Sequence, residues 1–259
     1  GVQTCALPIS DGKPIRYGKL VQGICLSQTD YCAEIEEQLA LGMRDFSPAG
    51  IWLDYLAYAG WFETPEPDLQ DNCFCDSCIE EFRNRTDIDV SSPDRIISHY
   101  AREWRSFKSD RIAEFASRYS SIIREHNPDC IVGAYMCPWT PDEYDNGLER
   151  IFGQNYEKLA DSIDIFTPLI YADKSGRPSD WGKTYLEASP SFIPRHNPVQ
   201  LILDYRDFPD LLLRTVESDV PSYGVQLFQG DALFSKPDEV ALFDRAVTKI
   251  RKENEKRDL

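Results

Sequence analysis

The sequence predicts an α/β fold built from repeated β-α units. From about Lys19 onward, short apolar or β-branched runs alternate with amphipathic helical patterns, which is typical of a parallel sheet. No Gly/Ser-rich linker interrupts this alternation, and no Gly-rich phosphate turn follows any strand. Six such units predict an N-terminally truncated (β/α)8 TIM barrel in which roughly the first two strands are missing. A doubly wound open sheet is the alternative.

Six runs are expected to form strands, because each is short, apolar and rich in β-branched or aromatic residues. In chain order they cover residues 20–25, 50–55, 131–135, 163–170, 199–203 and 224–228. In barrel numbering the run with Asp54 is the fourth strand and the run starting at Val199 is the seventh. Polar residues at the ends of these strands are expected on the C-terminal face, where barrel active sites lie.

One long helix is expected from about Asp94 to His126, where apolar residues recur at steps of three to five and form one apolar face. Shorter helical patterns fall near residues 30–41, 155–160, 211–219 and 237–252. The last of these is expected to pack as a closing helix.

Residues 1–9 resemble the translation of a sequencing adapter read in frame into the gene. We therefore treat residues 1–10 as an artefact and expect residues 11–259 to form one partial barrel domain. On this interpretation the natural start is missing and Cys5 carries no information, so the sequence assigns neither a cytoplasmic nor a secreted location. A genuine short N-terminal arm is the alternative.

The composition excludes some partners. The 259 residues include 44 Asp and Glu against 28 Lys and Arg, a formal net charge of −16. Binding to phosphate backbones or anionic lipid headgroups relies on Lys and Arg, so neither nucleic acid nor a membrane surface is expected as a partner. No apolar stretch approaches the ~20 residues of a membrane span. The sequence leaves the oligomeric state open.

Three of the cysteines lie within six positions, a spacing too crowded for independent cross-links: Cys73, Cys75 and Cys78. Three thiolates at this spacing can surround one metal ion, and a tetrahedral structural zinc site needs a fourth ligand. Cys25 is favoured as that ligand, because it ends the expected third strand on the same barrel face. The alternatives are Cys32 and Cys137.

The cysteine run, with Cys25-Leu26-Ser27-Gln28-Thr29-Asp30-Tyr31 upstream, resembles the zinc-binding cysteines of glycoside hydrolase family 42 β-galactosidases and of related uncharacterised TIM-barrel glycoside hydrolases. In those β-galactosidases one upstream cysteine joins a C-x-C-x-x-C run, and the zinc is structural. Residues 50–56 are similar to the G-I-x-L-D-Y/F strand of the uncharacterised families. The resemblance covers most of residues 11–245 and implies a TIM barrel that acts on glycosidic bonds.

One departure from family 42 concerns catalysis. Those enzymes carry Asn-Glu at the end of the fourth strand and a Glu on the seventh, whereas this chain has Asp54 and Asp204. The family's catalytic residues therefore do not carry over directly, and the resemblance does not imply galactosidase activity.

Glycoside hydrolysis requires two carboxyl groups, one as acid and the other as nucleophile or base. Asp54 is the first candidate because it directly follows an apolar strand, although capping a neighbouring loop is an equal alternative. Its partner is expected to be Asp204, which ends the seventh strand beside Arg206, or Glu63. Arg206 can pair with Asp204 or with Asp207, and a structural ion pair is the slightly favoured interpretation of Asp204. Aromatic neighbours of Glu63 can raise its pKa, as suits a general acid.

Aromatic rings in or near the loops after strands are candidates for stacking on sugar faces. They are Trp61, Trp139, Tyr171, Trp181 and Tyr205. Core packing explains each ring alone better than sugar binding does, but five near one face favour a carbohydrate cleft. Asp231, which follows Phe228-Gln229-Gly230, is a further polar candidate for the substrate site.

These patterns favour a glycoside hydrolase-like protein that cleaves an unidentified oligo- or polysaccharide with two carboxyl groups and contains a structural zinc. The alternative is a non-catalytic carbohydrate-binding barrel, which keeps the aromatic residues and the zinc but lacks a competent acid pair. A metal-dependent hydrolase is disfavoured, because four thiolates leave zinc no open coordination position.

Overall fold

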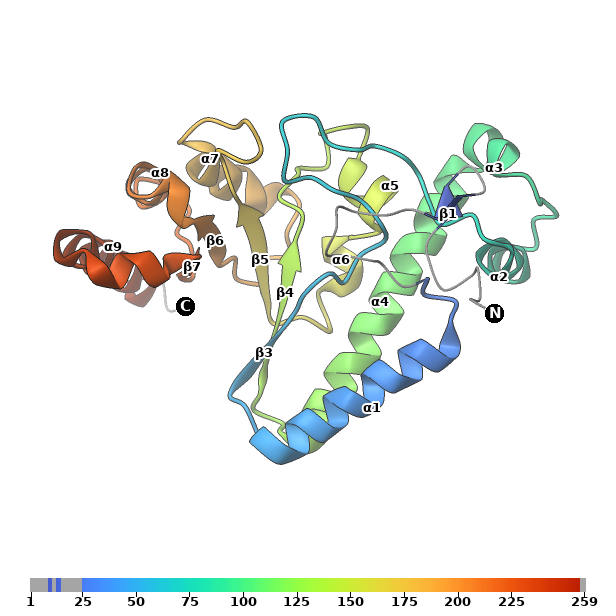
Figure 1. The fold of residues 1–259 in the computed structure, drawn as a ribbon, viewed down its shortest axis with the longest axis horizontal. Coiled ribbons are helices and arrows are strands. Elements are labelled where there is room, and N and C mark those ends of the chain that lie inside the picture. The colour runs from blue at the N-terminus through green and yellow to red at the C-terminus, as the bar shows by residue number, and fades with distance from the viewer. Residues whose placement is uncertain (1–8, 11–12, 15–24, 257–259) are drawn as a thin grey trace.

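The computed structural model describes residues 9–10, 13–14 and 25–256. Its centre is a parallel sheet in the order β3-β4-β5-β6-β7, with strands alternating with helices (Figure 1). These strands are Gly50–Leu53, Ile131–Met136, Ile165–Ile170, Leu201–Asp204 and Val225–Phe228. Two short strands, β1 (Ile9–Ser10) and β2 (Lys13–Pro14), pair antiparallel. The parallel sheet confirms the expected α/β fold and is consistent with part of a TIM barrel.

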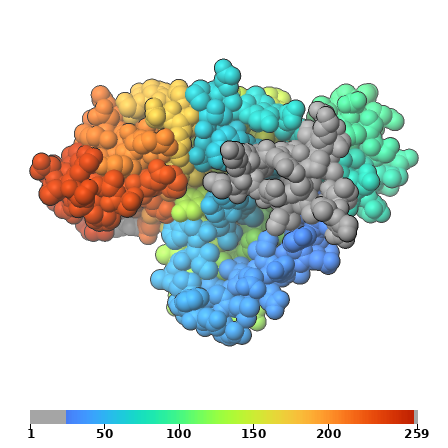
Figure 2. Space-filling model, in the orientation of Figure 1, coloured from blue at the N-terminus to red at the C-terminus, as the bar shows by residue number. Residues whose placement is uncertain are grey.

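Nine α-helices accompany the strands in the described part of the chain, besides the 3-10 helices Ser189–Ser191, Tyr205–Asp207 and Gly230–Ser235. They are α1 (Thr29–Phe46), α2 (Asp76–Thr86), α3 (Pro93–His99), α4 (Ala101–His126), α5 (Gly147–Phe152), α6 (Tyr156–Leu159), α7 (Trp181–Ala188), α8 (Asp210–Thr215) and α9 (Pro237–Glu255). Helices α1 and α4 lie side by side, whereas α7, α8 and α9 gather at the opposite end of the molecule (Figures 1 and 2). Among the described residues, no helix is both long and apolar enough to cross a lipid bilayer.

The sheet is curled, and two side-chain hydrogen bonds cross its concave face. Trp52 Nε1 on β3 donates to Thr167 Oγ1 on β5 over 2.8 Å, so the indole passes over β4. Gly133 on β4 leaves room for this ring, and a Cβ there would overlap it. The Tyr135 hydroxyl on β4 donates to Gln226 Oε1 on β7 over 2.9 Å. The second contact crosses two intervening strands, β5 and β6, and requires the curvature of a half-barrel.

The opposite face of the sheet packs against helices and forms much of the core. Alternate residues of the strands point to this face, and they are almost completely buried. They include Val132, Ala134, Phe166, Ile170, Leu201 and Leu203.

The expected long helix over 94–126 is wrong in one respect, since the structure contains two helices that meet at Tyr100. Tyr100 has φ −132° and ψ 26°, which is not helical. Its N–H still donates to the Ile96 carbonyl, and its own carbonyl accepts from the Trp104 N–H. The apolar spacing therefore continues through the kink and gives no sign of it. Except for Cys25, the strand expected over 20–25 lies outside the described residues.

Candidate active site and metal centre

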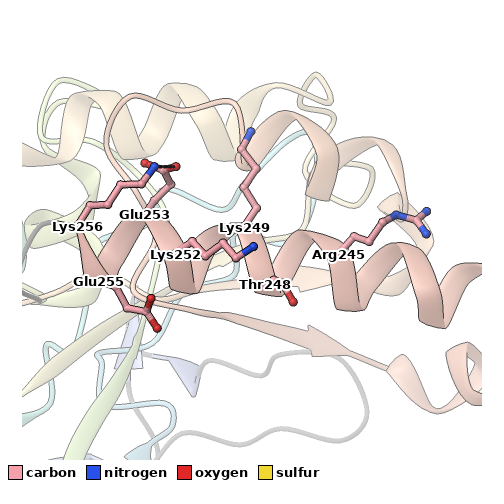
Figure 3. Close-up of a pocket in the computed structure, with 7 residues that line it drawn as sticks. All are labelled: Arg245, Thr248, Lys249, Lys252, Glu253, Glu255 and Lys256. Atoms are coloured by element: carbon pink, nitrogen blue, oxygen red, sulfur yellow. Dashed lines mark hydrogen bonds and ion pairs between the residues drawn. The ribbon is translucent and has the colours of Figure 1, made fainter.

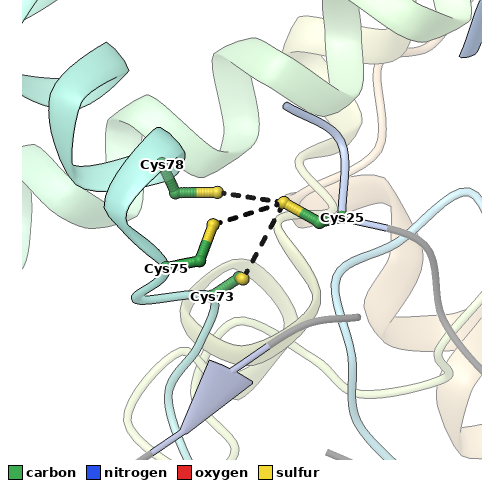
Figure 4. Close-up of side chains that lie close together, drawn as sticks. All are labelled: Cys25, Cys73, Cys75 and Cys78. Carbon is green, nitrogen blue, oxygen red and sulfur yellow. Dashed lines mark hydrogen bonds between the residues drawn. The ribbon is translucent and has the colours of Figure 1, made fainter. Parts of the chain in front are cut away.

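The four cysteines expected to bind a metal form one buried cluster (Figure 4). All four Sγ atoms lie within 4.8 Å of one another. Cys25 Sγ is 3.4 Å from Cys78 Sγ, 3.5 Å from Cys75 Sγ and 4.0 Å from Cys73 Sγ. Tetrahedral zinc with Zn–S bonds of about 2.3 Å separates its sulfurs by roughly 3.8 Å. The donor set and its spacing therefore fit a metal ion such as zinc.

Local structure brings these thiols together. Cys75 occupies the N-cap position of α2 and Cys78 lies in its first turn, where the helix dipole favours thiolates. Cys25 lies just before α1, and the nearby Ser27 hydroxyl lies 3.3 Å from Cys78 Sγ. Cys32 instead places its thiol against the Leu26 carbonyl, 3.7 Å away. Within the described ranges, this cluster is the group of side chains suited to hold a metal.

A cavity of about 620 Å³ lies along β3 and the loop after it, and residues of α1 and α4 also line it, among them Leu39 and Phe115. Trp52, Tyr135 and Leu169 line it from the strands, and Glu63 lines it from the loop after β3. Asp54 also lines this cavity, immediately after β3. Of the expected site residues, Asp54, Glu63, Trp61 and Tyr171 line this cavity, whereas Asp204 does not.

Asp54 lies at this cavity with one hydrogen bond. Its Oδ1 accepts the Tyr55 N–H over 2.9 Å. Burial raises the pKa of the Asp54 carboxyl, and this hydrogen bond offsets only part of the rise. Burial also raises the pKa of Tyr135, and the negative charge of Asp54 adds to that shift. Asp54 therefore has the environment of a carboxyl group that holds a proton more readily than usual.

Asp204 has the opposite environment. Its side chain is only 1% exposed and lies 3.1 Å from Lys174 Nζ and 3.2 Å from the Arg206 guanidinium. The Arg206 N–H also donates to it over 2.9 Å. Burial alone would raise the pKa of Asp204, but the hydrogen bonds from Arg206 and Lys174 outweigh it and hold the pKa below its usual value. Asp204 is thus held as a carboxylate.

Glu63 completes the group through the same lysine, whose Nζ lies 3.1 Å from Glu63 Oε2. Burial raises the pKa of Tyr171, and the negative charges of Glu63, Asp204 and Asp54 raise it further. The Tyr171 phenol therefore interacts electrostatically with Asp54, Glu63 and Asp204, the three carboxyl groups predicted from the sequence. Lys174 was not predicted, because a single lysine in a loop carries no spacing signal.

Comparisons with known proteins agree at the level of the fold. No family model matches the sequence, and neither does any curated protein. The structure is similar to a polyextremophilic β-galactosidase from the Antarctic haloarchaeon Halorubrum lacusprofundi, with a TM-score of 0.52 and 15% sequence identity. The match covers 77% of this chain and 34% of that chain, so this chain spans about a third of that protein's length. At this identity the likeness shows the fold alone.

The remaining substrate-site candidates lie in different environments. Trp61 and Tyr171 line the cavity. Trp139 is 2% exposed and packs against other rings, among them Phe62, Tyr144 and Phe152. Trp181 is also buried, and Tyr205 donates from its hydroxyl to Glu239 over 2.6 Å. Trp139, Trp181, Tyr205 and the exposed Asp231 do not line the cavity.

A second hollow lies along α9 and is lined by this helix alone (Figure 3). Its residues are Arg245, Thr248, Lys249, Lys252, Glu253, Glu255 and Lys256. Glu253 pairs with Lys256 over 2.8 Å. No second element of the described structure contributes converging groups, so this hollow has the character of an ordinary charged helix surface.

Proposed function

We propose that this chain is a glycoside hydrolase-like protein that cleaves an oligo- or polysaccharide with two carboxyl groups. The observation that carries the proposal is a group of three carboxyl groups. Asp54 and Glu63 line one cavity, and Lys174 joins Glu63 to the buried Asp204, with the pKa of Asp54 raised and that of Asp204 lowered. Opposite shifts of two carboxyl groups are the arrangement that acid and nucleophile require. The fold-level likeness to a β-galactosidase supports a carbohydrate substrate by analogy.

The shifts also suggest the role of each residue. Asp54, whose pKa is raised by burial, donates a proton to the glycosidic oxygen. Asp204, held ionised by Lys174 and Arg206, acts as nucleophile or stabilises the positive charge that develops on the sugar. Glu63 is the alternative partner of Asp54, because it lies at the same lysine. Trp61 and Tyr171, which line the cavity, are placed to stack on sugar rings.

The metal in this proposal is zinc held by the four cysteines. Four thiolates close its coordination shell, so the zinc supplies structural cross-linking and no catalytic chemistry. Its ligands lie just before α1 and at the start of α2, where the chain returns from the loop that carries Glu63.

The experiment compares wild type with Asp54→Asn, Asp204→Asn and the control Asp231→Asn. The substrates are aryl glycosides and plant or microbial polysaccharides. Asn keeps the size of Asp but removes the ionisable carboxyl, so we expect Asp54→Asn to lower kcat by about 10²–10⁴-fold with little change in KM. Asp231→Asn changes an exposed residue outside the cavity and should leave kcat unchanged. Full turnover by a folded Asp54→Asn protein contradicts its role as the acid.

A non-catalytic carbohydrate-binding barrel is the second candidate, and one observation favours it. Asp204 is almost completely buried and is paired with two cations, as a purely structural carboxylate would be. This candidate predicts no hydrolysis by wild type on any substrate, together with calorimetric binding of an oligosaccharide that Asp204→Asn leaves unchanged.

A further inference from the structure

Lys174 joins two carboxylates that come from different parts of the fold. Its Nζ lies 3.1 Å from Glu63 Oε2, in the loop after β3, and 3.1 Å from Asp204 Oδ2, at the end of β6. The side chains of Lys174 and Glu63 are 15% and 17% exposed, and that of Asp204 is 1% exposed. Charges this far from solvent are weakly screened, so they interact more strongly than a surface ion pair.

Contacts that do not involve its ammonium group fix the loop that carries Lys174. The Asp207 carboxylate accepts the N–H groups of Ala172 and Asp173 over 2.8 and 2.9 Å. Gly176 has φ +62°, a conformation that favours glycine, and it lies close to Pro65 in the loop that carries Glu63. The loop is therefore held from the β6 side by Asp207 and packs against the Glu63 loop.

Two aromatic rings flank the ammonium group itself. Lys174 Nζ lies 4.1 Å from the centroid of the Tyr171 ring and 4.6 Å from that of Phe228. These cation–π contacts help to hold the ammonium group between the two carboxylates.

Removing this charge would leave two carboxylates facing each other. The oxygens of Glu63 and Asp204 that share Lys174 Nζ are no further apart than twice 3.1 Å. When two carboxylates lie so near each other in a site with little solvent, ionisation of both is disfavoured. The pair then takes up a proton at a higher pH. Asp204 would keep Arg206, whereas no ion pair of Glu63 other than that with Lys174 is found in the described structure. Glu63 is therefore expected to take the proton.

This inference rests on the function proposed above. We propose that Lys174 is a positioning residue that holds the Glu63 and Asp204 carboxylates ionised and at a fixed separation, so that Asp54 is left as the proton-donating carboxyl group of the site. The titratable and charged groups that face Asp204 and Glu63 across the site are Lys174, Arg206, Asp54, Tyr55, Tyr171 and Asp207. Among them, Lys174 is the cation that contacts both carboxylates.

The test uses Lys174→Gln, which removes the charge, and Lys174→Arg, which keeps it. Lys183→Gln is the matched control, since it removes a lysine that pairs with Glu187 on α7. On a 4-nitrophenyl glycoside that wild type cleaves, Lys174→Gln should move the acidic limb of the kcat profile up by one pH unit or more. It should also lower kcat at least tenfold with little change in KM. Lys174→Arg and Lys183→Gln should keep the wild-type limb. An unchanged limb in Lys174→Gln overturns the proposal.

A second measurement does not depend on activity. In wild type labelled with ¹³C at the carboxyl groups, the Glu63 and Asp204 signals are assigned with Glu63→Gln and Asp204→Asn, and that of Asp204 should titrate below the usual range of an aspartate. In Lys174→Gln one of the two signals should titrate at a higher pH than in wild type. If this change appears while wild type cleaves no glycoside, the positioning role stands and the proposed function fails. If the Asp204 signal of wild type already titrates above the usual range, Lys174 does not hold this carboxylate ionised. That last result needs no variant to fold.

Discussion

At the scale of single residues, the position of the Trp52 ring, which lines the cavity, depends on Gly133. The Trp52 indole lies across Gly133 to reach Thr167. We predict that Gly133→Ala destabilises the protein by about 1–3 kcal/mol, because the added methyl group overlaps the indole in a packed interior. Urea unfolding followed by tryptophan fluorescence measures the change.

Gly42 provides the matched control for this substitution. It lies within α1, and a Cβ there meets no atom within 4 Å. Gly42→Ala should therefore stabilise the protein by about 0.5–1 kcal/mol, the usual gain of alanine over glycine inside a helix. A Gly133→Ala protein as stable as wild type would mean that the indole does not occupy the concave face.

The sequence located the carboxylates of the site better than it located their partners. Asp54 and Asp204 were predicted because they follow apolar strands, and the carboxyl ends of parallel strands share one edge of a sheet. The contact between Lys174 and Glu63 joins residues 111 positions apart in loops. No local pattern encodes such a contact, because it depends on the conformations of two separate loops.

At the scale of elements, the cysteine cluster links the start of α2 to the chain just before α1. A buried contact between Lys108 on α4 and Asp71 anchors the same returning loop two residues before Cys73. Lys108 also donates to the Arg150 carbonyl, so a charged side chain without solvent exposure has two oxygen partners. The loop that carries Glu63 thus ends in a segment fixed by an ion pair and by the thiols.

We predict one tightly bound zinc ion per chain, and loss of that metal in Cys78→Ser. Elemental analysis of the purified protein measures the stoichiometry. Chelation should lower Tm, because the free energy of metal binding contributes to folding. Cys32→Ser is the control, since the Cys32 thiol contacts the Leu26 carbonyl and lies outside the cluster, and it should keep the metal in full. A metal content near zero in untreated wild type contradicts the prediction.

The sequence predicted long elements more reliably than short ones. Each strand of the five-stranded sheet lies at a predicted run, and α1, α4 and α9 lie in predicted helical patterns. Three helices were not expected, namely α2, α5 and α7. Helices α5 and α7 span only 6 and 8 residues, too few turns for apolar spacing to repeat. Helix α2 begins within the cysteine run. Because these residues were interpreted as metal ligands, the helical spacing of α2 was not recognised.

At the scale of the whole molecule, the curvature of the sheet creates the site. A flat sheet would place Tyr135 and Gln226, which lie on β4 and β7, too far apart for their hydrogen bond. The same curvature turns the loops after β3, β5 and β6 toward one another, so that Glu63, Lys174 and Asp204 can meet. The site is therefore a property of the half-barrel and not of any single β-α unit.

The net charge of −16 leads to a prediction about salt. Repulsion among like charges acts over the whole surface, where the Debye length falls from about 30 Å at 0.01 M salt to about 8 Å at 0.15 M. The charges of an exposed ion pair such as Arg83–Asp89 lie only 2.6 Å apart, a distance shorter than the Debye length at either salt concentration. Each such pair contributes only about 0–1 kcal/mol to stability. Salt should thus relieve the repulsion more than it weakens the pairs.

We expect the free energy of unfolding to rise by about 1 kcal/mol, and Tm by roughly 2–4 °C, between these concentrations of NaCl. Scanning calorimetry at pH 7.5 measures it, with KCl as the control for ion-specific effects. A fall in Tm would show that ion pairs, and not net repulsion, dominate the electrostatics of this acidic fold.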